Sequence, residues 1–186
     1  VYKAFIADLD DAIETLEDYT DFTGFTKFDL VYNGDVNRWI QFANSLKLRL
    51  AIRMSKVDPA YAKTTGESAL AHASGLLADN ASNFVLSESA GAHPLNTINN
   101  GWGDIRMSAE MESILTGYTD PRLGAYFEPA TDEGLGIDGT YKGIRMGIDL
   151  PSKDVYGSHS PLTTFGGIQL MTSAEVEFLK AEAALR

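Results

Sequence analysis

The sequence predicts a mostly α fold, made of helical hairpins with long irregular loops and one small β-hairpin. Apolar residues recur at helical spacing through residues 1–77, and a helical pattern returns at residues 172–186. Between them, residues 78–171 are rich in Gly, Asn, Ser and Pro and are expected to be loop-rich with one short helix. At 186 residues and 44% hydrophobic content, the chain is long enough to bury a core. We therefore expect a single domain over residues 1–186.

The first predicted helix covers residues 1–16, where apolar residues occupy one face and acidic residues the others. Residues 19–34 follow without any period and are interpreted as a loop. Asp35 closes an Asn-Gly-Asp turn and is placed to cap the next helix, because its carboxylate can accept the free N–H groups of the first turn.

The strongest helical pattern covers residues 36–56, with further apolar residues beyond its main stripe, so this helix is expected to be buried between neighbours. The stripe comprises Trp39, Phe42, Ala43, Leu46, Leu50 and Met54. Pro59 suits the first turn of another helix, whose pattern continues to about residue 77. Together these segments predict a helical hairpin with a short connection.

The second half of the chain is expected to be mostly irregular. Residues 78–107 are too long for a passive connection and are typical of a functional loop. Ser108 is predicted to cap a short helix over residues 109–115. Residues 128–170 alternate Gly-rich turns with short segments such as residues 141–148, show no helical period, and are interpreted as irregular with one small hairpin.

A last helix is predicted to begin after Thr172, because Thr172 and Glu175 match a capping box. It should bury Val176, Leu179, Ala183 and Ala184. Since this pattern runs to the last residue and the chain opens with Val1 in another helical pattern, we expect an internal fragment of a longer protein. No apolar run approaches the roughly 20 residues of a membrane span, so any membrane attachment is expected outside it.

Charge and composition narrow the possible ligands. Fifteen Lys and Arg against 26 Asp and Glu give a net charge of -11, which repels nucleic acid and anionic membranes and favours a neutral ligand or a protein partner. The absence of cysteine excludes disulfides and thiolate metal sites. The histidines, at positions 72, 93 and 159, lack metal-site spacing, so no metal or cofactor is expected. Scattered Asp residues and loop carbonyls leave a calcium site open.

Three segments, in order along the chain, resemble the SusD/RagB family. They are DLVYNGDVNRWIQFANSLKLRLAIRMSKVDP at residues 29–59, DPRL at residues 120–123 and SAEVEFLKAEAALR at residues 173–186. A partial, degenerate match to tetratricopeptide repeats accompanies them at Trp39, Ala43, Ala51 and Pro59.

The resemblance implies a superhelix of tetratricopeptide-like helix pairs decorated by long loops. It implies a non-catalytic, lipid-anchored protein of the outer membrane that faces the outside and captures oligosaccharides or other nutrients. It also implies delivery of that ligand to a SusC-type TonB-dependent transporter, with the anchor outside this sequence.

The residues that carry the resemblance are expected to be structural, because the helix that bears most of them is wrapped by apolar side chains. They are Trp39, Asn44, Arg49, Arg53, Asp120 and Arg122. Asn44 or Arg49 is expected to satisfy polar groups of neighbouring segments, with Asp120 and Arg122 among the partners.

Ligand binding is predicted in the loop around Trp102, which stands between two glycines in an amide-rich stretch. Sugars stack on aromatic rings while amide and guanidinium groups bind their hydroxyls, so the candidates are Trp102, Asn99, Asn100 and Arg106. Weaker candidates are Tyr118, Tyr141 and Tyr156. The alternative is that Trp102 only fixes the loop onto the core.

Three alternatives remain open. A glycosidase would need two carboxylates, yet the pairs in residues 8–11 and 132–133 are typical of solvated charges, and no catalytic motif is present. A tetratricopeptide-like scaffold would hold a peptide in a groove between helices. Finally, the ligand site could be supplied by residues outside this sequence.

Overall fold

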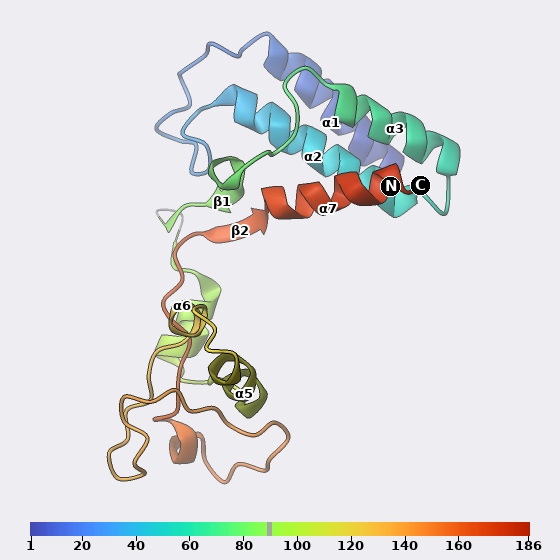
Figure 1. Ribbon diagram of the computed structural model, residues 1–186. Helices are drawn as coiled ribbons and strands as arrows, with labels where there is room; N and C mark the ends of the chain where they lie inside the picture. The colour runs from blue at the N-terminus through green and yellow to red at the C-terminus, as the bar shows by residue number, and fades with distance from the viewer. Residues whose placement is uncertain (89–90) are drawn as a thin grey trace. The chain divides into compact units, whose positions relative to one another are not determined.

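The computed structural model of the protein describes residues 1–88 and 91–186 (Figure 1). It divides into two compact units, which we call the helical unit, residues 1–90 with 168–186, and the loop unit, residues 91–167. The prediction of a mostly α fold is confirmed, and the strands of the described residues form one two-stranded sheet. In the described ranges, no helix is both long and apolar enough to cross a membrane. The assignment of one domain over residues 1–186 stays a prediction.

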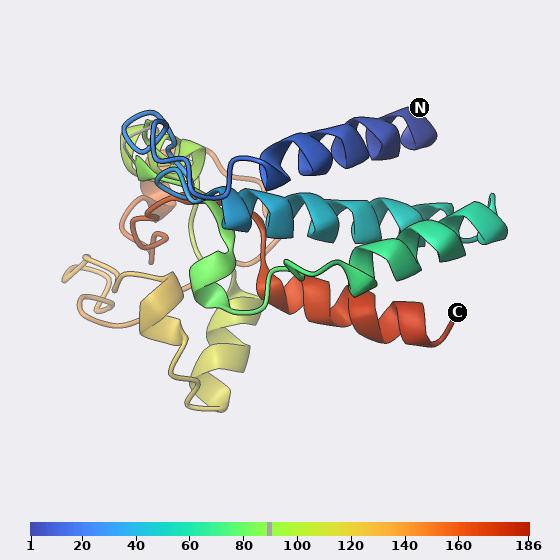
Figure 2. The ribbon, with the colours of Figure 1, turned by 90° about the horizontal axis from the view of Figure 1, so that it is seen from above.

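Four α-helices make up most of the described part of the helical unit. They are α1 (Tyr2–Glu17), α2 (Val36–Met54), α3 (Pro59–Ala71) and α7 (Ser173–Ala184). Because α2 is apolar on several faces, it is the central helix and contacts α1, α3 and α7; α1 and α3 flank it in Figure 2. Its Ile40 and Leu48 are fully buried. The predicted hairpin of α2 and α3 is confirmed, with Asp58 capping α3 by accepting the N–H of Tyr61.

Two cations of α2 bind the helices around it. Lys47 is buried, and its Nζ lies 2.5 Å from Asp10 of α1. The Arg49 guanidinium forms a bidentate salt bridge with the Glu175 carboxylate of α7. Its Nε donates at 2.6 Å and its Nη2 at 2.5 Å, which is the geometry that Arg commonly forms with carboxylates. These contacts join α2 to helices that are distant in the sequence.

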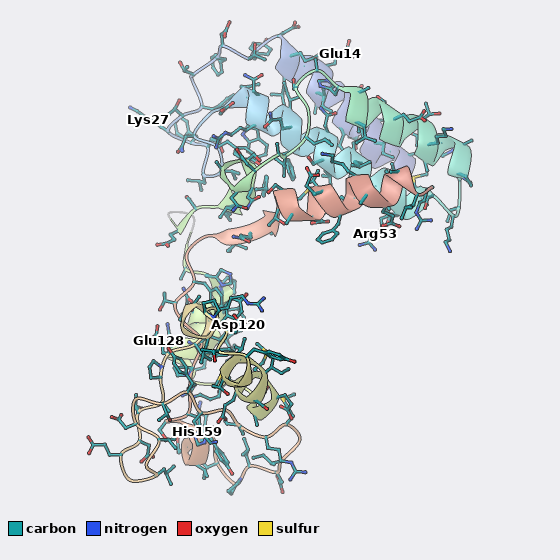
Figure 3. The ribbon with its side chains drawn as sticks, viewed as in Figure 1. Glu14, Lys27, Arg53, Asp120, Glu128 and His159 are labelled. Atoms are coloured by element: carbon teal, nitrogen blue, oxygen red, sulfur yellow. The ribbon has the colours of Figure 1, made fainter. Side chains whose placement is uncertain are left out.

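The remaining residues of the motif differ in their surroundings. Asn44 is fully buried, and its amide finds no hydrogen-bond partner among the described residues. Arg53, labelled in Figure 3, is exposed near the end of α2. It has no ion-pair partner among the described residues. Asp120 and Arg122 pair with each other in the loop unit, at 2.6 Å. Each therefore has a partner within its own turn, and a role of the two residues as partners of the α2 motif stays a prediction.

The turn before α2 is organised by Asp29. Its carboxylate accepts the N–H groups of Val31, Tyr32 and Gly34 and, at 2.9 Å, the indole N–H of Trp39. Burial raises the pKa of Asp29, but these hydrogen bonds outweigh it and leave the pKa below its usual value. Gly34 has φ of +84°, which favours glycine. Residues 29–39 of the motif therefore form a closed turn that is bound to α2 through the hydrogen bond between Asp29 and Trp39.

The third helix is shorter than predicted. It ends at Ala71, because His72 is extended and Gly75 turns the chain at φ +72°. Leu77, expected at the helix end, is still fully buried, and its N–H donates to the Ser45 hydroxyl of α2. The apolar pattern up to Leu77 thus predicted the burial of this residue correctly, but it predicted a helical conformation after Ala71 that the chain does not adopt.

The sheet pairs two distant segments, β1 (Phe84–Leu86) and β2 (Ile168–Met171), in antiparallel register. The expected small antiparallel β structure is confirmed, but β2 pairs with the distant β1 and not with a second strand within residues 128–170, where Ile144 forms a parallel bridge with Ser108. Residues 78–107, expected to be irregular, also contain a short 3-10 helix, η1 (Asn80–Ser82).

The start of α7 agrees only in part with the predicted capping box. Thr172 caps the helix by accepting the Glu175 N–H at 3.3 Å. The Glu175 carboxylate binds Arg49 instead of reaching back, so the reciprocal half of the prediction is wrong. A bidentate, charged hydrogen-bond pair with Arg49 stabilises the Glu175 carboxylate more than one hydrogen bond from a backbone N–H would.

Short elements make up the loop unit. They are α4 (Pro94–Asn96), the π-helix η3 (Thr97–Gly101), α5 (Ala109–Gly117), α6 (Leu123–Tyr126) and the 3-10 helix η4 (Lys153–Tyr156). Ser108 caps α5 as predicted, by accepting the N–H of Met111. A core of Met107, Leu115 and Phe127 holds the unit together.

Candidate functional site

Three segments of the loop unit are cross-linked by backbone hydrogen bonds. The Ile144 N–H donates to the Met107 carbonyl at 2.8 Å, and the Ala109 N–H donates to the Ile144 carbonyl at 2.9 Å. Ser160 joins the third segment, because its carbonyl accepts the Met107 N–H at 2.8 Å and its N–H donates to Lys142 at 3.0 Å. These bonds give the loop unit a defined frame without regular strands.

A hollow of about 430 Å³ opens beside this frame. It is lined by Gly103, Asp104, Arg106, Met107, Ser108, Ile144, Arg145, Met146, Gly147, Ile148, Leu150, Lys153 and Tyr156. The lining combines apolar side chains with three cations and one carboxylate, a mixture suited to a ligand with apolar faces and polar edges.

Some polar side chains of the hollow are already hydrogen-bonded to the protein, and others are not. Arg106 donates to the Gly157 carbonyl from Nε at 2.9 Å and Nη2 at 2.6 Å, and burial lowers the pKa of its guanidinium. Lys153 donates to the Trp102 carbonyl at 2.6 Å. The Arg145 guanidinium and the Tyr156 hydroxyl have no partner among the described residues. These two groups are the ones available to a ligand.

The predicted ligand residues are separated by the structure. Trp102 is 58% exposed, directly precedes the lining residue Gly103, and is held through its carbonyl by Lys153. Arg106 lines the hollow but is occupied by protein carbonyls. Trp102 and Arg106 thus belong to one region, and both stay predictions as ligand contacts.

The two predicted asparagines lie elsewhere. Asn99 is 3% exposed; its amide donates to the Leu162 carbonyl at 2.8 Å and accepts the Leu162 N–H at 3.1 Å. Asn100 reaches Thr164 at 3.5 Å. Asn96, one helical turn earlier, binds Phe165 as Asn99 binds Leu162. The side-chain amides of Asn96 and Asn99 thus bind the backbone of residues 162–165 to the segment of α4 and η3, a role that the sequence did not predict.

The three weaker tyrosine candidates also differ. Tyr118 is 82% exposed at the end of α5. Tyr141 packs against the core of the unit, whereas Tyr156 lines the hollow. Sequence reasoning missed Arg145 and Lys153, because isolated cations in a Gly-rich stretch carry no local signal.

Other ionisable groups near the frame serve the fold. Glu112 binds Lys142 at 2.9 Å and accepts the Gly143 N–H at 2.8 Å. Asp132, considered above as a catalytic acid, accepts the Leu135 N–H and the Ser158 hydroxyl. Among residues 1–88 and 91–186, no group of three or more His, Asp or Glu side chains is arranged to hold a metal ion.

His159 lies in the loop unit (Figure 3), and its titration should make the stability of this unit sensitive to pH. Burial lowers the pKa of His159 from its ordinary 6.5, with Lys142 adding to the effect, and its Nδ1 has no partner among the described residues. The unfolded chain therefore binds the proton first, so this contribution is complete above pH 6.5 and is lost as the pH falls through the lowered pKa. Urea unfolding at pH 7.5 and 5.5 should show a smaller loss for His159→Gln than for the wild type. Equal losses would contradict this role.

Comparisons with known proteins give the family. The family model described as SusD-like, Susd and RagB outer membrane lipoprotein, matches residues 1–186. No curated protein matches the chain. A chitin-binding SusD homolog from Flavobacterium johnsoniae is 39% identical with a TM-score of 0.82, and the match covers 100% of this chain and 39% of that one.

Two further solved structures agree. A SusD homolog from Bacteroides vulgatus is 35% identical with a TM-score of 0.78, covering 100% of this chain and 39% of that one. Another from Bacteroides uniformis is 36% identical with a TM-score of 0.75, covering 99% and 39%. The chain thus spans about two fifths of the length of these proteins. With the family model matched from the first residue to the last, the chain belongs to the SusD-like family of outer-membrane lipoproteins.

Proposed function

We propose that the full-length protein binds a glycan at the cell surface without altering it chemically, and that the hollow of the loop unit forms part of the site. The observation that carries the proposal is that the Arg145 guanidinium and the Tyr156 hydroxyl line the hollow without a partner among the described residues, while Trp102, which precedes the lining residue Gly103, has an exposed ring. An aromatic face can stack on a sugar ring while these donors bind its oxygens. Membership of the family supports the same role.

The lining suggests which glycan to test first. Met146 and Leu150 are exposed apolar side chains next to Arg145 in the hollow. An N-acetyl group presents a methyl and a carbonyl oxygen, which match an apolar side chain and a guanidinium. The solved homolog from Flavobacterium johnsoniae is described as chitin-binding, and chitin is an N-acetylated glycan. We therefore place chitin oligosaccharides at the head of the panel.

The family also supports the rest of the proposed role. We propose that the protein is lipid-anchored in the outer membrane, faces the outside and passes its ligand to a SusC-type TonB-dependent transporter. Co-purification of the full-length protein with such a transporter from outer membranes would test this part independently of ligand binding.

The test of the site is calorimetric titration of the full-length protein with chitin, starch and β-glucan oligosaccharides and a set of peptides. Trp102→Ala should weaken the binding of the preferred glycan at least tenfold, since stacking on an aromatic ring contributes about 1–3 kcal/mol in ring-stacking sites. Tyr118→Ala is the matched control, because Tyr118 is also an exposed ring of the loop unit but, unlike Trp102, is not next in the sequence to a residue that lines the hollow.

Either of two results would oppose the proposal. Unchanged affinity of Trp102→Ala would remove the hollow from the site, and release of product from chromogenic glycosides would show catalysis.

A peptide-binding role is the second candidate, favoured by a hollow of about 270 Å³ among the side chains of α2, α3 and α7. Leu48, Ala51, Gly66 and Leu70 contribute to it, as expected of a groove between helices. If a peptide of the panel binds and Leu70→Glu abolishes that binding while Trp102→Ala does not, this candidate replaces the first.

A further inference from the structure

The loop between α1 and α2 carries an aromatic side chain at every third position. Tyr19, Phe22, Phe25 and Phe28 are 54%, 45%, 61% and 78% exposed. Tight turns explain this spacing: the Phe22 N–H donates to the Tyr19 carbonyl at 2.9 Å, and the Phe28 N–H donates to the Phe25 carbonyl at 2.8 Å. Neighbouring rings meet edge to face, with centroids 6.3 Å and 5.4 Å apart along the first three. We call residues 19–30 the aromatic loop.

Fixed contacts hold the aromatic loop at its far end. Asp29 ties it to Trp39 of α2, and the Leu30 carbonyl accepts the Ser87 N–H at 2.9 Å. A Cβ at Gly34 would lie 2.9 Å from the backbone nitrogen of Thr26, so the loop packs closely on the turn. Exposed rings on an anchored loop lose little conformational entropy on binding, which favours recognition.

A second hollow, of about 540 Å³, lies against this loop. It is lined by Leu16, Phe25, Phe28, Asp29, Leu30, Val31, Gly34, Val36, Trp39 and Leu86. The Asp29 carboxylate and the Trp39 indole N–H are its polar side-chain groups, and they are bonded to each other. A sugar would find no free polar side chain there, whereas an aliphatic or aromatic side chain would bury apolar surface.

The charge around the loop is strongly negative. Residues 8–21 contain seven carboxylates, and residues 4–26 contain no Lys or Arg. The acids are Asp8, Asp10, Asp11, Glu14, Glu17, Asp18 and Asp21. Among the described residues, Asp10 pairs with Lys47, Glu17 lies 3.3 Å from His72, which is charged only when protonated, and the other five acids have no ion-pair partner. Figure 3 labels Glu14 of α1 and Lys27, the one cation of the loop. Such a field attracts a cationic partner and repels an anionic one.

We propose that the aromatic loop and its hollow form a docking surface for a segment of a partner protein that presents Leu- or Phe-type side chains flanked by Lys or Arg. Apolar anchors fill the hollow between Phe25 and Phe28, and the cations face the carboxylates of residues 14–21. This surface shares no lining residue with the glycan hollow of the loop unit, and its test does not depend on the proposed function.

The first test asks whether the surface is free in the full-length protein, since related proteins are much longer than this chain. Phe28→Cys is reacted with a maleimide in the native state and in urea. A native rate within about tenfold of the rate in urea is expected for a ring position that is 78% exposed. Protection by more than a hundredfold would show that the rest of the chain covers the loop and would overturn the proposal. So would protection by a glycan of the panel.

The second test uses three 14-residue helical peptides, composed of Leu with Lys, Leu with Glu, and Ser with Lys. The Leu–Lys peptide should bind saturably, the other two at least tenfold more weakly, and Phe28→Ser should weaken the Leu–Lys peptide at least tenfold. Phe178→Ser is the matched control, because Phe178 is also 78% exposed but belongs to α7. Absence of Leu–Lys binding, or equal binding by Phe28→Ser, would overturn the proposal; circular dichroism checks that both variants fold.

Discussion

Replacing Asp29 by Asn should destabilise the protein by about 3 kcal/mol, because the substitution leaves donors without acceptors in a partly buried turn. One carboxylate oxygen accepts the N–H groups of Val31 and Tyr32, and the other accepts those of Gly34 and Trp39. An amide has a single acceptor oxygen, so whichever way it turns, two of these donors face an NH2 group. Urea unfolding of wild type and variant measures the difference.

The matched control is Asp21→Asn, which removes the same charge from the same loop. Asp21 has no hydrogen-bond partner among the described residues, so its substitution should change stability by no more than about 0.5 kcal/mol. Since the pKa of Asp29 lies below its ordinary 3.8, the advantage of the wild type over Asp29→Asn should be complete above pH 3.8 and decline as the pH falls further. A variant as stable as the control would show that the turn does not depend on the carboxylate.

Local sequence signals predicted the helices of the helical unit well. Residues 1–16 and 36–56 were predicted, and the helices cover Tyr2–Glu17 and Val36–Met54. Asp35 caps α2 by accepting the Arg38 N–H, as its position suggested. These features depend on side-chain spacing and on contacts within one turn, which are present in the sequence itself.

Three of the differences share another origin, since each of these features depends on a distant partner. The β1 strand is stabilised by β2, more than eighty residues later, and neither alternates clearly on its own. The Glu175 carboxylate could accept either the Thr172 N–H or the Arg49 guanidinium. Only the packing of α7 on α2 brings Arg49 Nε to 2.6 Å from Glu175 Oε1. Leu77 keeps the apolar pattern of α3 beyond its end because α2 and α7 bury it.

The candidate site shows the same division. Trp102 stood out because an aromatic residue between glycines is a local pattern, and its ring is exposed. The amide of Asn99 looks the same in the sequence whether it binds a ligand or the Leu162 backbone. Arg145 and Tyr156 line the same hollow as residues 103–108 only in the folded chain. What a ligand can use is therefore decided by tertiary contacts.

The frame that positions these groups should fail when Gly143 becomes Ala. A Cβ there would lie 2.7 Å from the backbone nitrogen of Ala109 and still closer to the carbonyl group of Ser108. These are backbone atoms next to the bridge between Ser108 and Ile144, so they cannot rotate away as the end of a side chain would. Separating the segments should destabilise the loop unit by about 3 kcal/mol, the upper range for forced overpacking. Thermal unfolding measures this loss.

Gly117→Ala is the matched control for this prediction, since a Cβ at Gly117 has no neighbour within 4 Å and the residue ends α5 in the same unit. That substitution should be neutral or stabilising by up to about 1 kcal/mol, because alanine favours the helix. Hydrogen exchange then localises the effect: in Gly143→Ala the amides of Ala109 and Ile144 should exchange faster, while those of α2 stay protected. Because Arg145 follows directly on this bridge, glycan binding should weaken together with the frame. Normal binding in a destabilised Gly143→Ala protein would separate the ligand site from the hollow and direct the search to residues beyond this chain.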